Sequence, residues 1–161
     1  MSHDYIKSSI EFFAKILKLY KCFSEESGNK FAESFNTRAR SGPQLIKDIG
    51  LIPYITFLAS KAGENLCVKA FEALRLSDDI CKGVDEDVLK NPNKMGYAAY
   101  TIAILDYLAK LNVIKLDKYE TLNVIKSLSD GLMKYRAVEP LVMKYLNELK
   151  KLSSAYFRKE E

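Results

Sequence analysis

Residues 4–23, DYIKSSIEFFAKILKLYKCF, repeat their apolar side chains with the period of an α-helix. The intervals are four, three, four and three residues, from Ile6 through Ile10, Phe13 and Leu17 to Tyr20. Such spacing places apolar side chains on one face of a helix. The opposite face is mostly basic and includes Lys15 and Lys18. The stretch therefore predicts a long amphipathic helix with a solvated back.

Residues 134–158, KYRAVEPLVMKYLNELKKLSSAYFR, predict a second long amphipathic helix at the other end of the chain. Their apolar positions again follow intervals of four and three: Val138, Val142, Tyr145, Leu149, Leu152 and Tyr156. Pro140 is compatible only with the first turn of a helix, because proline lacks the backbone N–H. We therefore expect helical hydrogen bonding to begin near Val138 or Glu139.

The segments between these ends also have helical periodicity, and none sustains the two-residue alternation of a strand. The pattern predicts shorter helices over 30–40, 43–49, 51–62, 65–82, 95–112 and 117–128. Residues 51–62 are apolar nearly all round and should form the central buried helix. Predicted breaks are the turn at 24–30, Ser41-Gly42-Pro43, Gly50, Gly63 and a long loop over 83–94. The expected fold is all-α: a single domain over 1–161, built as an irregular bundle of six to eight helices.

The composition excludes several classes of catalytic site. The chain has 161 residues, 48% of them hydrophobic and 29% charged, which is typical of one globular domain. Tryptophan is absent, and His3 is the only histidine. A histidine metal cluster and a Ser–His–Asp or Cys–His catalytic set are therefore excluded. No phosphate-binding glycine loop or H-E-x-x-H motif occurs either, so we expect no catalytic residue, no metal and no cofactor.

The cysteines and the start of the chain indicate a cytoplasmic protein. Cys22, Cys67 and Cys81 are odd in number and form no C-x-x-C pair, so we expect three reduced thiols. The N-terminus lacks the pattern of a signal peptide. The longest apolar stretch, 95–111, contains Asp106 and is shorter than the span of about 20 residues that a membrane requires. We expect a soluble protein with no membrane contact.

The carboxylates do not form a recognisable motif. Five of them lie between residues 78 and 87, without the spacing of a calcium loop: Asp78, Asp79, Asp85, Glu86 and Asp87. A solvated acidic rim is the favoured interpretation, and a hydrolytic site that uses two carboxylates is the alternative. Asp106 lies within an apolar helix, either on a narrow polar stripe with Lys110 and Asn112 or buried and paired. A buried pair would favour a structural role.

Positive charge is the functional signal that remains. The net charge is +4, from 25 basic and 21 acidic residues. Rows of cations suit the phosphates of a polyanion, although they also serve as ordinary solvated faces. Arg38 and Arg40 stand out because arginine binds phosphate with two hydrogen bonds. The candidate phosphate-binding residues are Lys15, Lys18, Arg38, Arg40, Lys47, Lys61, Lys144, Lys150, Lys151 and Arg158. The tyrosines that share the helix over 95–112, such as Tyr97, are expected at the edge of the core.

Two stretches resemble the small subunit of the Cmr complex, the type III-B CRISPR effector that targets RNA. Residues 38–61, RARSGPQLIKDIGLIPYITFLASK, match its signature of a basic or small stretch before Pro43, an apolar pair, a Gly-Leu break and a closing Phe-Leu-x-x-Lys. Residues 135–155 resemble its last helix. The chain departs from the family pattern at Gly42, Ile49 and Glu148, where Leu, Asn and Trp are usual.

The resemblance implies a subunit without catalytic activity in an antiviral ribonucleoprotein. Such subunits stack head to tail, and their basic surface lines the groove in which guide RNA pairs with target RNA. The implied partners are other Cmr subunits, copies of the chain itself, and both RNAs through their backbones. The alternatives are a helical adaptor that binds only proteins and the small subunit of another CRISPR effector type.

Overall fold

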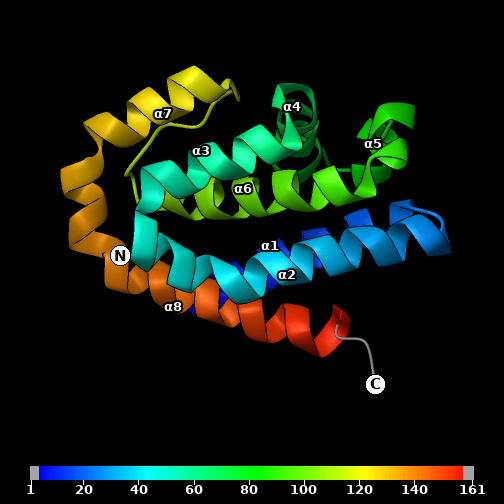
Figure 1. Cartoon of the computed structure of the whole chain (residues 1–161), viewed down its shortest axis with the longest axis horizontal. Helices are drawn as coiled ribbons and strands as arrows, with labels where there is room; N and C mark the ends of the chain where they lie inside the picture. The colour runs from blue at the N-terminus through cyan, green and yellow to red at the C-terminus, as the bar shows by residue number, and fades with distance from the viewer. Residues whose placement is uncertain (1–3, 158–161) are drawn as a thin grey trace.

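The computed structural model describes residues 4–157, which fold into helices joined by turns and by one longer connection over residues 111–120 (Figure 1). The α-helices are α1 (Tyr5–Cys22), α2 (Glu25–Ile49), α3 (Leu51–Ala62), α4 (Glu64–Phe71), α5 (Glu86–Lys90), α6 (Pro92–Lys110), α7 (Thr121–Asp130) and α8 (Leu132–Phe157). A π-helix, η1 (Glu72–Leu76), continues α4, and a 3₁₀-helix, η2 (Ile80–Gly83), follows it. The predicted all-α fold is confirmed, with long helices at both ends of the described chain.

Helix α6 forms the centre of the bundle and packs against α2, α3, α4 and α8 (Figure 1). Every residue from Ala98 to Leu108 is buried. The prediction that residues 51–62 would be central is wrong, because α3 leaves Thr56, Phe57, Ser60 and Lys61 exposed. Helix α6 contains Gly96 and four alanines, and these small residues let neighbouring helices approach it from several sides.

Helix α2 runs without a break from Glu25 to Ile49, so the two helices predicted on either side of Ser41-Gly42-Pro43 are one. Gly42 serves close packing here: a Cβ at this position would lie 2.2 Å from the Tyr100 hydroxyl. The helix ends instead at Gly50, whose φ of 94° suits glycine, as predicted. Residues 25–30, predicted as a turn, form the first turns of α2 behind its N-cap, Ser24.

Helix α8 likewise continues through its proline. It begins at Leu132 rather than near Val138, and Pro140 lies within it. Because Pro140 is exposed, solvent can bind the carbonyl that the missing N–H leaves free. Three other boundaries also differ from the prediction. Helix α4 passes into η1 and ends before residue 77, the loop predicted over 83–94 contains α5, and Glu120 rather than Asp117 caps α7.

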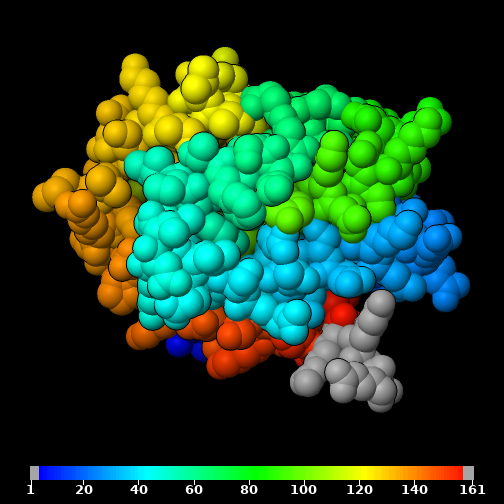
Figure 2. All heavy atoms as spheres, in the orientation of Figure 1, coloured from blue at the N-terminus to red at the C-terminus, as the bar shows by residue number. Residues whose placement is uncertain are grey.

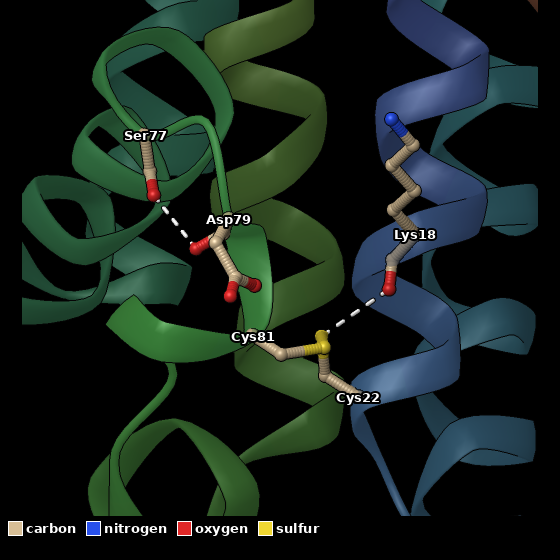
Figure 3. The surroundings of a disulfide bond; sticks show 5 residues. All are labelled: Lys18, Cys22, Ser77, Asp79 and Cys81. Carbon is tan, nitrogen blue, oxygen red and sulfur yellow. Dashed lines mark hydrogen bonds between the residues drawn. A yellow bond between two sulfur atoms is a disulfide. The ribbon is translucent and has the colours of Figure 1, made fainter.

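A disulfide joins Cys22, the last residue of α1, to Cys81 in η2 (Figure 3). The prediction of three reduced thiols is therefore wrong for these two, which are 59 residues apart in the sequence. Cys67 is free and buried, and burial raises the pKa of its thiol to about 11. The pairing depends on α1 packing beside η2, which the spacing of cysteines along the chain does not encode.

No helix within residues 4–157 has the length and apolar character to span a bilayer.

Candidate nucleic-acid interface

Four side chains from three helices meet on the face formed by α2, α3 and α6: Arg38, Phe57, Lys61 and Tyr97. We call this cluster the cation–aromatic patch. The guanidinium carbon of Arg38 lies 4.2 Å from the centre of the Tyr97 ring. The Tyr97 and Phe57 rings meet edge to face with their centres 6.2 Å apart. The Lys61 ammonium nitrogen lies 5.9 Å from the centre of the Phe57 ring. Figure 2 shows a strip of α6 exposed between α2 and α3 on this face.

Close packing between α2 and α6 brings Arg38 over Tyr97. A Cβ on Gly96 would lie 2.2 Å from the Ser34 hydroxyl and 2.9 Å from the Phe35 backbone nitrogen, so only glycine permits this approach. The Ser34 hydroxyl also donates a 2.6 Å hydrogen bond to the Asn93 carbonyl, which links α2 to α6 where the two helices cross. Arg38 follows Ser34 by one helical turn, and Tyr97 follows Gly96 directly. The crossing therefore determines which cation covers which ring.

Buried tyrosines support the patch from below. Tyr54 is fully buried and stacks on Phe57, with 6.3 Å between ring centres and 25° between ring planes. Its ring also meets that of Tyr100 edge to face. Burial raises the pKa of both hydroxyls well above the usual value, and the nearby charge of Arg38 opposes this effect at Tyr54. The exposed Phe57 ring thus rests on packed, uncharged rings that restrict its motion.

The cations of the patch differ from other cations of the described chain that pair with carboxylates. Neither Arg38 nor Lys61 has a carboxylate of residues 4–157 within ion-pair distance, whereas Lys69 pairs with Asp85 and Arg75 with Asp106. A guanidinium stacked on a ring keeps its N–H edge available for an oxyanion. Phe57 is 39% exposed, with Lys61 over its ring and with Tyr97, which carries Arg38, against it. The arrangement can bind a phosphate and stack a planar ring beside it.

The other predicted cations lie elsewhere. Arg40 is two residues beyond Arg38, about 200° around the helix, and is exposed on the other flank of α2. The two arginines therefore do not share one surface. Lys47 is exposed further along α2. On α1, Lys15 is half-buried, and Figure 3 shows Lys18 on the flank that faces the segment containing Cys81.

The lysines of α8 form a third group. The Lys144 ammonium lies 5.8 Å from the centre of the Tyr5 ring, Lys150 is exposed, and Lys151 forms a 3.1 Å ion pair with Glu148. Arg158 lies outside the described residues. Of the nine predicted cations that are described, only Arg38 and Lys61 are joined through one aromatic cluster.

A family of CRISPR-associated proteins, Cas_Cmr5, matches this chain over residues 14–156. The chain belongs to the Cmr5 family. The CRISPR system CMR subunit Cmr5 of Saccharolobus solfataricus is 30% identical over 131 residues, which cover 78% of this chain and 80% of that protein. No solved structure matches the chain. The resemblance to the small subunit of the Cmr complex is thus confirmed.

Sequence reasoning identified the cations of this Cmr5-family patch and missed its rings. The sequence predicts Tyr97 at the edge of the core and gives it no binding role. It marks Phe57 only as part of the Phe-Leu-x-x-Lys signature of the family. The i, i+4 spacing of Phe57 and Lys61 is visible in the sequence. The contact of Arg38 with Tyr97 is not, because it depends on how α2 crosses α6.

Two acidic residues of the Cmr5-family chain, Asp85 and Asp106, have structural partners. Asp85 caps α5 by accepting from the Val88 N–H, and its hydrogen bond with Lys69 lowers the pKa of the carboxyl. Asp106 is buried and paired, with Arg75 Nε at 3.0 Å and Lys110 Nζ at 3.3 Å. This confirms the buried alternative. The described residues contain no group of three or more His, Cys, Asp or Glu that could hold a metal ion.

Proposed function

We propose that this Cmr5-family chain is the non-catalytic small subunit of a type III-B CRISPR ribonucleoprotein that acts in antiviral defence in the cytoplasm. In this role it stacks along the complex and lines the groove in which guide RNA pairs with target RNA. The observation that carries the proposal is the family match over residues 14–156.

The chemistry of the chain suits this role. When a guide supplies sequence specificity by base pairing, a lining subunit needs to follow only the shape and backbone of the RNA. Spaced cations perform that task through phosphate contacts, without reading bases. The proposed contacts are Lys15, Lys18, Arg38, Arg40, Lys47, Lys61, Lys144, Lys150, Lys151 and Arg158.

Assembly would strengthen the RNA binding of a single subunit. Stacked copies meet through two different faces, which is the heterologous arrangement that builds arrays. The several surfaces on which the cations lie suit a subunit that contacts both RNA and neighbouring subunits. A few phosphate contacts from each copy then add up through avidity along the array.

Purification of the tagged chain from the organism that encodes it tests this function. We expect other Cmr subunits, identified by mass spectrometry, together with repeat-derived guide RNA, identified by sequencing. Recovery of protein partners without RNA would overturn the groove-lining role and favour the adaptor alternative. Salt provides an independent criterion, because RNA contact through phosphates weakens steeply with ionic strength and apolar docking changes little.

A further inference from the structure

We infer that the cation–aromatic patch is a binding site for single-stranded RNA, in which an unpaired base stacks on Phe57 while Arg38 and Lys61 hold the adjacent phosphates. This inference rests on the proposed function, since it names a particular RNA contact for the subunit. It goes beyond that function because backbone-following cations alone would not engage a base.

The geometry of the patch combines the two elements that bind single strands. Such sites place cations along the backbone and aromatic rings under the bases. Here Phe57 is 39% exposed and lies between Lys61, 5.9 Å from its ring centre, and Tyr97, on which Arg38 stacks at 4.2 Å. Arg38 covers Tyr97 at 4.2 Å, whereas Lys61 lies over Phe57 at the longer distance of 5.9 Å. Phe57 is therefore the ring on which a base can stack, with the flexible Lys61 side chain turning from the ring to the adjacent phosphate.

The support beneath the patch lowers the cost of binding. Tyr54 stacks on the inner side of Phe57, and Tyr54 is itself fully buried. A ring held by a packed core loses little conformational freedom when a base stacks on it. Arg38 is likewise held by Tyr97 rather than by a carboxylate. A phosphate therefore does not have to displace an ion-pair partner within residues 4–157.

The aromatic surface favours RNA over an acidic peptide as the occupant. Carboxylates of a peptide would use the two cations and leave Phe57 without a function in binding. A nucleotide uses both, since it carries an anion and a planar ring within one unit. This difference makes Phe57 the residue whose substitution separates the two partners.

The absence of tryptophan from the chain provides a direct measurement. The Phe57→Trp variant places the only tryptophan of the chain in the patch, where it can be excited selectively over the tyrosines. Leu122→Trp places one on α7, where Leu122 is 76% exposed. We expect a single-stranded oligouridine of roughly 12 nucleotides to quench the first variant and not the second. Fully paired RNA should bind without quenching. Equal quenching of both variants, or none in either, would overturn the stacking assignment.

Affinities of the full-length chain for fluorescein-labelled oligouridine at low salt provide the second measurement. Phe57→Leu should weaken binding at least about fivefold, because a stacked base contributes that much or more. Arg38→Gln should weaken it by more than Arg40→Gln, a matched loss of charge on the other flank of α2. Circular dichroism and thermal melting would verify that each variant is folded.

Several results would contradict the inference. Equal losses from Arg38→Gln and Arg40→Gln, with no effect of Phe57→Leu, would mean diffuse attraction to phosphate. Tighter binding of an oligoglutamate peptide, unaffected by Phe57→Leu, would make the occupant an acidic protein segment. Absence of oligouridine binding to the unaltered chain would overturn the patch as a site. The purification experiment that tests the proposed function does not depend on these results. Guide RNA can be recovered with the tagged chain even if the patch does not stack a base, so the two proposals can fail independently.

Discussion

Asp106 is a buried carboxylate in the central helix, α6. It forms ion pairs with Arg75, which precedes it in the chain, and with Lys110, which follows it by one helical turn. Arg75 reaches it from the π-helix η1 and also donates a 2.6 Å hydrogen bond from Nη1 to the Leu116 carbonyl. One guanidinium thus ties the core to the segment that leads into α7. This network explains how the buried stretch of α6 accommodates an acidic residue.

Asp106→Asn should lower the free energy of unfolding by about 3 kcal/mol, because it removes one partner of a buried ion pair and leaves two cations without a counter-charge. Urea denaturation measures the change. Glu11→Gln is the control, since the Lys7–Glu11 pair is exposed with a 3.9 Å separation, and little change is expected there. Similar losses from the two substitutions would contradict the structural role of Asp106.

At the scale of the helices, the crossing of α2 over α6 depends on glycine at the point of contact. Alanine is the better helix former by about 1 kcal/mol, which would favour it at Gly96 on local grounds. The structure opposes this preference, because the added methyl would lie 2.9 Å from the Phe35 backbone nitrogen as well as against Ser34. A backbone atom inside a helix cannot rotate away as a side chain can.

Gly96→Ala should therefore destabilise the protein by about 1–3 kcal/mol through overpacking. It should also reduce oligouridine binding, because separating α2 from α6 moves Arg38 off Tyr97. Gly83→Ala is the control, since a Cβ there meets nothing within 4 Å. Denaturation should show a lower stability for Gly96→Ala than for Gly83→Ala, and binding measurements should show a lower affinity for oligouridine. A neutral Gly96→Ala variant would show that the helices can move apart without cost.

The disulfide joins α1 to η2 across 59 residues of sequence. Replacing both Cys22 and Cys81 with Ser should lower the free energy of unfolding by roughly 2–4 kcal/mol, mainly because the unfolded chain loses a cross-link. The unaltered protein in a reducing agent should show the same loss. Thiol titration of the unfolded, unreduced protein should detect Cys67 alone. Detection of three thiols would contradict the pairing.

At the scale of the whole molecule, buried tyrosines govern the response to alkali. Burial raises the pKa of Tyr54, Tyr100 and Tyr145 well above the ordinary value of 10.0. In the unfolded chain these hydroxyls ionise near that ordinary value. Their contribution to stability is therefore fully present below about pH 10 and is lost as the pH rises above it.

We expect the free energy of unfolding to fall steeply above about pH 10, with tyrosinate absorbance rising cooperatively as the fold is lost. Tyr54→Phe should shift this transition to higher pH, because one fewer hydroxyl ionises on unfolding. The Tyr54 hydroxyl has no hydrogen-bond partner among the described residues, so the substitution should cost little at neutral pH. Gradual ionisation of these tyrosines in the folded protein would disagree with their burial.

The sequence by itself determined the all-α fold, the long amphipathic helices at both ends and the family. Hydrophobic periodicity is local, and the Pro43 to Lys61 stretch carries its signature within a few turns. Gly50 and Gly63 were predictable as breaks because their positive φ angles are a local property of glycine. The cations Arg38 and Lys61 were also visible as candidates.

Only the tertiary structure decided which residues meet. Gly42 and Pro43 lie inside a continuous helix because packing against Tyr100 outweighs their local preference to end one. The disulfide between Cys22 and Cys81 and the stacking of Arg38 on Tyr97 both join segments that are far apart in the chain. Arg38 and Arg40 are close in sequence and lie on different flanks, because about 200° of helical rotation separates them. Composition and periodicity record which side chains are present, whereas helix crossings determine which of them form a surface.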